Sequence, residues 1–491
     1  MDGKTIRTLS LGPALLLAGC TVGPNYQRVS APVPAHWDVP EPWRESAPSD
    51  GLAKGAWWEI FHDETLNSLE KDSLTANQTL KVAAAHLEQA RASAAIQVAT
   101  QFPQFGTSPS AYRQRLSGNR PTNTNLPSTG NPVTQNTYTL PFTVSYEVDL
   151  FGRRRRTIEA SQAGYQATAA DLENTRLVIT AELAGDYYTL RQVDTEIGIL
   201  RRTVEALSKG LDLVNSRHKG GVASGLDVAQ EETLLNTTRT QAILLQQQRK
   251  QLEDAIAILV GKAAPEFHLE PKELDSEPPT IDAGIPSDLL ERRPDIAQAE
   301  REMAIANAQI GIARAAYFPS LSLFADGGWQ AADIAKLLNV QSAVWAIGAN
   351  AAEAIFTGGQ RRAQVQFAKA GYDASVASYR QTVLNAFGEV QDSVTGLLIL
   401  SEAEKSQQQA VDAARRTLQI AEGRYTGGLV NYLDVVSAQQ NLLSNEQQLA
   451  VIRGQKLVNS VLLVKALGGG WDSSSLAALQ VKPKLKDVIA P

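Results

Sequence analysis

The residue types that most often perform catalysis are scarce in this chain and poorly placed for it. The 491 residues include one cysteine and five histidines. These histidines are His36, His62, His86, His218 and His268. They have no metal-ligand spacing among them, and a disulfide framework, a cysteine-based zinc site and a haem-attachment motif all lack the residues they need. No nucleophile–base pair is apparent either. We therefore expect no enzymatic activity, no metal and no dissociable cofactor.

The cysteine is the one residue whose position indicates a specific reaction. Residues 1–19 begin with Lys4 and Arg7, continue through an apolar stretch and end with small residues directly before Cys20. This pattern is typical of a secretory signal and resembles the bacterial lipobox, in which the cysteine becomes the acylated first residue. Thr21 follows, where an aspartate would tend to retain a lipoprotein at the inner membrane. We expect a covalent lipid on Cys20 and an outer-membrane location.

Charge and hydropathy exclude other classes of protein. The chain has 46 Lys+Arg against 52 Asp+Glu, a formal net charge of −6, and 43% hydrophobic residues. That balance excludes a basic nucleic-acid binder and a disordered tail. The chain has no apolar run of about 18 residues, so an ordinary helical membrane protein is also excluded. Contact with a membrane must come by another route.

The elements that position these residues occur twice. A shift of 207 residues aligns the two halves without a gap over a long stretch, as expected for an internal repeat. The aligned landmarks are Gly152-x-Arg154-Arg155 with Gly359-x-Arg361-Arg362, Gly220-Gly221 with Gly427-Gly428, and Leu226-Asp227-Val228 with Leu433-Asp434-Val435. We divide the chain into a signal peptide (1–19), an extended lipidated tether (20–56), repeat 1 (57–261), a proline-rich linker (262–288), repeat 2 (289–469) and a C-terminal tail (470–491).

Each repeat is predicted to contain long helices. The first begins with one helix over 64–100, whose counterpart spans 294–317. A longer helix follows over 153–217 in repeat 1 and 361–424 in repeat 2, reverses at a glycine pair and returns over 226–260 and 433–467. Apolar residues from Leu190 to Val214 recur at 3,4 spacing, which predicts coiled-coil packing. At 1.5 Å per residue the long helix would reach roughly 100 Å, so it must project from any compact domain.

Between the helices lie two predicted β-hairpins, at about 103–150 and 319–356. Apolar and polar residues alternate from Tyr138 to Leu150, which is typical of a strand with one apolar face. Pro141 argues against a central strand, and Gly327-Gly328 predicts a break in the second hairpin. Four strands cannot close a barrel, and an open edge in a bilayer leaves backbone groups unsatisfied. Closure must therefore come from several chains, and three would leave a lumen.

Three stretches of sequence resemble the outer membrane factor family. They are Leu289-Leu290-Glu291-Arg292-Arg293-Pro294-Asp295-Ile296 through Ala316-Tyr317-Phe318-Pro319, the run from Ser145 to Arg153, and Tyr425-x-x-Gly428 with Leu433-Asp434-Val435. This family comprises the TolC-like exit ducts of tripartite efflux pumps, and the lipoprotein branch fits best. The resemblance implies an α+β membrane protein: a homotrimer with a twelve-stranded transmembrane β-barrel, a long α-helical coiled-coil barrel, and an equatorial belt made from the termini and the linker.

The resemblance also implies partners and sites. The partners are a periplasmic adaptor and an inner-membrane pump, most often of the resistance-nodulation-division type, with no nucleic acid. The adaptor would dock on the helical tips. These tips comprise Gly220, Gly221, Val222, Ala223, Gly427, Gly428, Leu429 and Val430. Trp329 and Trp345 are expected to be membrane-interface anchors, and the run Arg153–Arg156 an interfacial basic cluster.

Asp227 and Asp434 have two interpretations. An acid in the first turn of a helix stabilises the helix dipole, and both repeats place one there. The family resemblance implies instead that three copies of Asp434 form an acidic ring at a periplasmic aperture, while Tyr425 bonds toward Asp227 to keep the coils closed. Ser437 and Val430 depart from the family pattern at this lock, so the closed state is expected to rest on fewer polar contacts.

Two alternative functions remain open from the sequence. One is the exit duct of a type I protein-secretion system. The other is a structural coiled-coil lipoprotein that spans the periplasm without a pore. The exported compounds cannot be read from the sequence, because a wide duct selects little.

Overall fold

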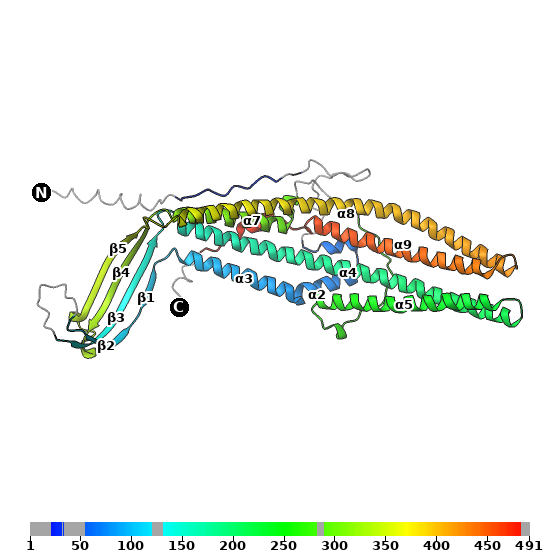
Figure 1. Cartoon of the computed structure of the whole chain (residues 1–491), viewed down its shortest axis with the longest axis horizontal. Coiled ribbons are helices and arrows are strands. Elements are labelled where there is room, and N and C mark those ends of the chain that lie inside the picture. The colour runs from blue at the N-terminus through cyan, green and yellow to red at the C-terminus, as the bar shows by residue number, and fades with distance from the viewer. Residues whose placement is uncertain (1–20, 32, 34–54, 120–130, 282–288, 483–491) are drawn as a thin grey trace.

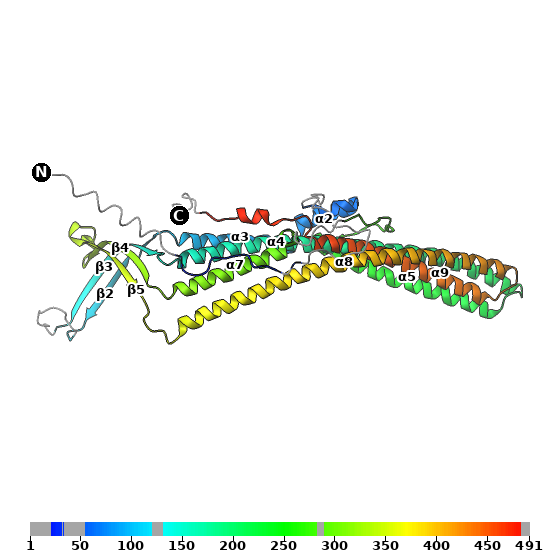
Figure 2. The same ribbon diagram turned by 90° about the horizontal axis from the view of Figure 1, so that it is seen from above.

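The protein is a long body of helices with a small sheet at one end (Figure 1). The computed structural model describes residues 21–31, 33, 55–119, 131–281 and 289–482. Two perpendicular views show the helices running side by side, with the turns that follow the two longest helices lying together at the end opposite the sheet (Figure 2). Over the described ranges, none of the helices is both long and apolar enough to cross a membrane.

The internal repeat is visible in the helix lengths. Repeat 1 contains α2 (Glu64–Ala76), α3 (Gln78–Ala99), α4 (Arg153–Lys219) and α5 (Gly225–Leu259), and repeat 2 contains α6 (Leu289–Arg292), α7 (Pro294–Ala315), α8 (Gln360–Thr426) and α9 (Tyr432–Ala466). α3 and α7 each have 22 residues, α4 and α8 each have 67, and α5 and α9 each have 35. Each long helix is therefore about 100 Å long.

The prediction of one helix over 64–100 was wrong. The chain leaves the helical conformation at Asn77 (φ −57°, ψ 126°), and the side chain of this residue caps α3 by accepting from Leu80 N–H (3.1 Å). Its Nδ2 also donates to the carbonyl of Leu259 at the end of α5 (2.9 Å). The interruption has its counterpart at Arg293, directly before α7. Both repeats are therefore interrupted at this point. In repeat 1 the interruption lies where α5, the helix that returns from the turn, ends.

Glycines let the shorter helices meet end to end beside each long helix. A methyl group added at Gly261, just after α5, would lie 2.7 Å from the carbonyl oxygen of Ala76, the last residue of α2. One added at Gly468 would lie 2.1 Å from the carbonyl oxygen of Arg292, directly before α7 begins. Both glycines have positive φ, which other residues adopt only at a cost. α4 packs along α3, α5 and α7, and α8 along α7 and α9.

Five of the eight apolar positions of the predicted seam of α4 are buried, and the other three are half-buried. Leu190, Val193, Leu200 and Val214 are fully inaccessible to solvent, and Leu207 nearly so. Toward the turn the seam meets Leu234 and Leu235 of α5 and Val435 of α9. These contacts join the two helical hairpins, α4 with α5 and α8 with α9, near their turns.

The sheet contains β1 (Gln104–Thr107), β2 (Ser110–Leu116), β3 (Val133–Val148), β4 (Ser320–Ala331) and β5 (Ala343–Ala352), all antiparallel. Its order is β1-β3-β4-β5, and β2 pairs with the remainder of β3. β1 and β2 thus share one position, so the chain supplies four strand positions, as predicted. The two outer positions, β1/β2 and β5, each have one strand neighbour within the described sheet.

Two details of the strands differ from expectation. β4 continues through Gly327-Gly328 without the predicted break. Pro141 does lie in a central strand, with Gly328 as its partner on β4. On its other side, β3 faces the gap between β1 and β2, where the ladder is interrupted and no backbone donor is needed.

The register gathers apolar residues on one face of the sheet. Phe142, Val144 and Tyr146 of β3 pair with Gly327, Ala325 and Leu323 of β4, which pair in turn with Trp345, Ile347 and Ala349 of β5. Thr143, Ser145 and Glu147 alternate with them on β3 and point to the other face, beside Asp326 and Ser322 of β4. The sheet therefore has an apolar face and a more polar face.

The segment after Cys20 is not a free tether. Residues 21–31, here called the strap, lie against α4 and α7. Val22 N–H donates to the carbonyl of Phe151 (3.2 Å), and Asn307 Nδ2 to that of Pro24 (3.1 Å). A methyl group added at Gly23 would lie 2.6 Å from the Cα of Gly311. The strap contains no helix or strand, in keeping with the predicted extended segment, but it packs on the body. The sequence pattern does not show this packing, because the contacted residues lie more than a hundred positions away.

The linker packs against the middle of α4. Asp194 and Thr195 of α4 accept from the backbone N–H groups of Lys272 (3.1 Å) and Leu274 (2.8 Å). Arg249 of α5 donates to Asp194 (2.6 Å) and to the carbonyl of Leu269 (2.5 Å). These buried charges are paired, and the pairing ties the linker to the body.

Candidate functional site

The two helical turns farthest from the sheet have the same backbone plan. In the first, Gly221 has φ +76°, and Val222 N–H donates to the carbonyl of Arg217 (2.9 Å). In the second, Gly428 has φ +74°, and Leu429 N–H donates to the carbonyl of Arg424 (2.9 Å). Glycine tolerates this left-handed conformation, which explains why a glycine pair marks each reversal. The predicted tip residues thus lie together at one end of the molecule (Figure 1).

Apolar side chains protrude from both turns. Val222 is 70% exposed and Leu429 is 71% exposed, whereas Ala223 and Val430 are half-buried. Leu226 and Leu433, at equivalent positions in the first turns of α5 and α9, are also exposed. These two leucines were missed as site residues, although the repeat alignment contained them. The tips present an apolar surface larger than predicted.

The structure separates the two acids that the sequence treats as equivalent. Asp227 forms a capping box with Ser224: the Ser224 N–H donates to Oδ2 of Asp227 (3.0 Å), and the Asp227 N–H donates to Oγ of Ser224 (3.2 Å). Asp434 has no such partner, because Asn431 stands at the corresponding cap position and its side chain forms no cap hydrogen bond. The Asp434 side chain is exposed. Both acids lie in the first turn of a helix, where they can stabilise its dipole, but only Asp227 also forms a side-chain cap.

Tyr425 joins the two hairpins through its ring. The guanidinium of Arg217 on α4 lies 4.8 Å from the centroid of this ring, and the centroid of the Tyr432 ring also lies 4.8 Å from it. Burial raises the pKa of Tyr425, with Arg217 opposing and Asp227 adding to the rise. Among the described residues the structure records no hydrogen bond between Tyr425 and Asp227, although the two interact electrostatically. Arg217 and Tyr432 were not identified from sequence.

The arginine run at the other end of α4 is fully paired. Arg153 and Arg154 share Glu147 (2.6 and 3.1 Å), and Arg155 contacts Asp149 (3.2 Å). Arg156 contacts Glu159 (2.7 Å). The carboxylate of Asp149 also accepts from the N–H groups of Arg154 and Arg155, which caps α4. The arginines therefore connect the start of α4 to the end of β3 and do not form a free basic surface.

Arg293 explains the arginine-arginine-proline-aspartate motif. It forms a two-pronged contact with Asp295 (3.0 and 2.7 Å) and donates from Nη1 to Glu389 of α8 (2.7 Å) and to the carbonyl of Ala466 of α9 (3.0 Å). One nearly buried side chain thus holds the start of α7, the middle of α8 and the end of α9. This role is structural.

The tryptophans expected at the membrane lie on the apolar face of the sheet. Trp329 pairs with Leu140 of β3 and makes an edge contact with Phe142 (6.5 Å between ring centroids). Trp345 of β5 is 79% exposed. An exposed indole on an apolar face is typical of a surface that meets lipid.

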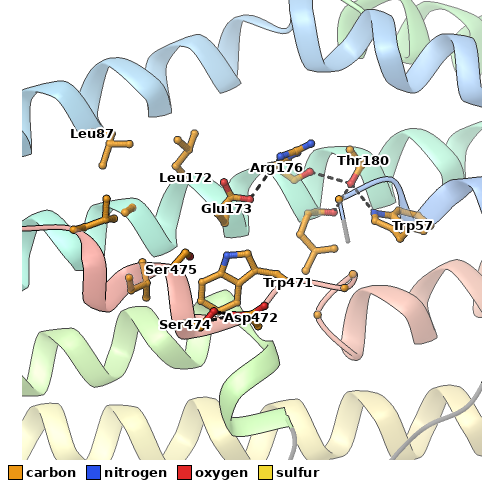
Figure 3. Close-up of a pocket in the computed structure, with 18 of the residues that line it drawn as sticks. Trp57, Leu87, Leu172, Glu173, Arg176, Thr180, Trp471, Asp472, Ser474 and Ser475 are labelled. Atoms are coloured by element: carbon orange, nitrogen blue, oxygen red, sulfur yellow. Dashed lines mark hydrogen bonds and ion pairs between the residues drawn. The ribbon is translucent and has the colours of Figure 1, made fainter. Parts of the chain in front are cut away.

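A groove of about 480 Å³ opens midway along the helical body, between α4 and the two terminal regions. Trp57 and Trp471 lie on its walls with Arg176 and Glu173 of α4 (Figure 3). The indole N–H of Trp57 donates to Thr180 Oγ1 (3.2 Å), and Arg176 contacts Glu173 (3.8 Å). The buried indole nitrogen of Trp58, which also lines the groove, has no hydrogen-bond partner among the described residues. Over the described ranges no cluster of three metal-ligating side chains occurs.

Cys20, the predicted lipid attachment site, and the signal peptide lie outside the described residues. Thr21 is described, and it packs against Gly152, where strand and helix meet: a methyl group on Gly152 would lie 2.8 Å from Thr21 Cγ2.

A family model described as outer membrane efflux protein matches residues 69–262 and 285–469. The two matched stretches overlap the two repeats.

Similar proteins share nearly the whole chain. A probable efflux pump outer membrane protein, TtgC of Pseudomonas putida, is 34% identical over 471 residues, covering 95% of this chain and 96% of its own. The solved outer-membrane channel OprN has a TM-score of 0.84 at 31% identity and covers 92% of this chain and 100% of its own. The outer membrane channel CmeC of Campylobacter jejuni has a TM-score of 0.84 at 27% identity, over 93% and 96%.

Proposed function

The chain belongs to the outer membrane efflux protein family, and on that premise we propose that three copies form a passive exit duct through which a pump and an adaptor expel drugs or other small molecules. The observation that carries the proposal is the division of the molecule into two ends. One end is a four-position sheet with an apolar face and two outer strands that lack a second neighbour within the described chain. The rest is a helical body whose two longest helices are each about 100 Å long.

The sheet supports closure between chains. An open strand edge in a bilayer is costly, because water cannot satisfy its backbone groups. Pairing β5 of one copy with β1/β2 of the next removes both edges, and three copies give twelve strands with a lumen. The apolar face would then meet lipid and the polar face the lumen.

The tips support docking of a periplasmic adaptor, with an inner-membrane pump beyond it. The docking residues are Gly220, Gly221, Val222, Ala223, Gly427, Gly428, Leu429 and Val430, to which we add Leu226 and Leu433 on the strength of their exposure. An apolar patch at the end of a long projection is typical of a protein-binding surface.

The same end supports an aperture. Asp434 is exposed and uncapped, so three symmetry copies can face a common axis as an acidic ring. Tyr425 contacts both Arg217 of the first helical hairpin and Tyr432 of its own, and so links the two helical hairpins of one chain. We propose Asp227, Tyr425 and Asp434 as the residues of this gate, with Asp227 acting chiefly through the helix cap that it forms.

We also propose that Cys20 is acylated and anchors the chain in the outer membrane. The adjacent strap packs where strand meets helix, at the boundary expected for lipid headgroups. Labelling with a radioactive fatty acid tests this, and equal incorporation into wild type and Cys20→Ser would refute it.

Reconstitution of the purified full chain in planar bilayers tests the duct. We expect discrete conductance steps, because a twelve-stranded barrel leaves a lumen. A stable, correctly inserted trimer without conductance would favour a structural lipoprotein that spans the periplasm.

A further inference from the structure

A buried acid lies near the tips and has no part in the gate described above. Glu231 of α5 is completely inaccessible to solvent. It lies one turn after Asp227, in the layer where α5 meets α4 and α9. A buried carboxylate is expensive unless it is paired and hydrogen-bonded, so its presence needs an explanation.

Glu231 contacts each neighbouring element through one residue. On α4, Gly210 leaves the space that the carboxylate fills: a methyl group added there would lie 2.5 Å from Oε1 of Glu231. On α9, the hydroxyl of Tyr432 faces the carboxylate. Neither carboxylate oxygen nevertheless has a hydrogen bond of good geometry among the described residues. The contact is thus close but incompletely satisfied.

The internal repeat shows that packing alone does not require this acid. The position equivalent to Glu231 is Ala438, which is also buried, and the position equivalent to Gly210 is Thr417. In repeat 2 the same layer is therefore filled without a charge. The acid and the glycine that accommodates it occur in repeat 1 only.

The contact leads directly to the residues of the gate. Tyr432 is the first residue of α9, two residues before Asp434, and its ring packs on Tyr425. Tyr425 in turn lies over Arg217. The path from Glu231 to Tyr432, Tyr425 and Arg217 thus connects the first hairpin to the second and back again.

We propose that Glu231 is a positioning residue of the entrance: its buried carboxylate couples the two hairpins through Tyr432, and its ionisation favours separation of the tips. The inference rests on the proposed duct, because a gate is meaningful only in a channel. An ionised and poorly satisfied carboxylate gains hydration when the tips part, whereas the neutral acid does not.

The direction of the pH dependence follows. Burial raises the pKa of Glu231 in the packed arrangement above its ordinary value of 4.5. The packed tips therefore retain a proton that separated tips release, so acid favours the packed arrangement and rising pH favours separation. The groups that face Glu231 or act on Tyr432 are Tyr432 itself, Tyr425 and Glu422 of α8, with Arg217 of α4 beyond the Tyr425 ring and Asp227 on its own helix.

Spin-label distances between the two tips test the inference. Labels on V222C and L429C, both exposed positions, report the separation of the hairpins in the full chain. From about pH 5 to about pH 8 we expect the ratio of separated to packed tips to rise, by up to about tenfold for each unit of pKa difference between the two arrangements. Glu231→Gln should remove this rise and keep the tips packed.

Two further variants complete the test. Glu232→Gln makes the same charge change at the next residue, which is exposed, and should keep the wild-type pH dependence of tip separation. Tyr432→Phe removes the one hydroxyl that faces the carboxylate and should increase separation roughly tenfold at about pH 8. The inference would be overturned if Glu231→Gln kept the wild-type rise of tip separation with pH, or if Glu232→Gln also lost this rise.

Conductance of the same proteins distinguishes this inference from the proposed function. Tip distances that follow Glu231 in a protein that does not conduct would refute the duct and leave the coupling intact. If the protein conducts but its tip distances do not change on Glu231→Gln, the coupling is refuted and the proposed duct is not.

Discussion

At the scale of single residues, equivalent positions of the two repeats have different environments. Asp227 is tied into a capping box with Ser224, whereas Asp434 is exposed and its helix begins at Asn431 without a side-chain cap. The same residue type at the same place in the repeat therefore has a structural role in one copy and is available for another role in the second.

This difference predicts that alanine substitutions at the two positions affect different properties of the protein. Asp434→Ala should weaken cation preference and block by multivalent cations, with little change in stability, because a ring of three carboxylates acts on permeant charge. Asp227→Ala should lower stability by about 1 kcal/mol, the usual worth of a cap, with little change in selectivity. Reversal potentials and thermal unfolding measure the two effects. If Asp434→Ala destabilises the protein and leaves selectivity unchanged, the acidic ring is wrong.

Tyr425 provides a second prediction at this scale. Tyr425→Phe keeps the ring beside Arg217 and Tyr432 but removes the hydroxyl, so the stack should survive while the electrostatic interaction of the hydroxyl with Asp227 is lost. Tyr425→Ala removes both. Because a closed population near 99% corresponds to about 2.7 kcal/mol, we expect more frequent opening in Tyr425→Phe and much more in Tyr425→Ala. Single-channel recording and sensitivity of cells to large antibiotics are the measurements. If both variants open as often as the wild type, Tyr425 is not part of the gate.

Glu70 of α2 provides a prediction about stability and pH. It is completely buried, neither oxygen has a hydrogen-bond partner among the described residues, and burial raises its pKa to about 9. The folded chain therefore keeps a proton that the unfolded chain releases above its ordinary pKa of 4.5, and stability falls as pH rises between these values. At pH 7 the cost is on the order of 3 kcal/mol.

Glu70→Gln should remove that cost. We expect a higher unfolding temperature than wild type at about pH 8 and a similar one at about pH 4, measured by circular dichroism. Glu64→Gln, an exposed position on the same helix, should follow the wild type. Parallel curves for wild type and Glu70→Gln would show that Glu70 is charged or solvated in the folded protein.

At the scale of elements, the strap makes the body begin much earlier than the sequence suggests. Its contacts with α4 and α7 include the close approach of Gly23 to Gly311, the bond between Arg156 and Asn25 (2.8 Å), and an ion pair between Arg28 and Glu300 (3.6 Å). The strap thereby brings Thr21 to the junction between sheet and helices.

A valine at Gly23 should release the strap. Gly23 has φ +104°, and a side chain there would strike Gly311, so Gly23→Val combines backbone strain with a collision. We expect trypsin to cleave after Arg28 several-fold faster and the protein to lose about 1–3 kcal/mol of stability. Gln27→Val, an exposed position on the same strap, is the control. Unchanged cleavage in Gly23→Val would mean that the strap is not held by this contact.

At the scale of the whole molecule, the proposed assembly depends on the outer strands of the sheet. The protein purified in mild detergent should be trimeric, because pairing β5 with β1/β2 of a neighbour closes both edges. Light scattering with the detergent contribution subtracted gives the mass. A monomer that remains stable and conducts would contradict closure between chains. A stable dimer would contradict the proposed number of three chains.

The sequence alone predicts the features that depend on local periodicity. Glycine pairs gave the two reversals, 3,4 spacing gave the seam of α4, and alternation gave β3, because each pattern follows from the geometry of its own element. The exact 207-residue repeat then predicted the second copy from the first, and helix lengths match between copies.

Only the tertiary structure decides what depends on partners distant along the chain. The break at Asn77 follows from the end of α5, the docking of the strap from Gly311, and the tolerance of Pro141 from the gap between β1 and β2. The coupling of Glu231 to Tyr432 joins residues about 200 positions apart. Burial and pairing are properties of a neighbourhood assembled by folding, so no pattern within one helix or strand contains them.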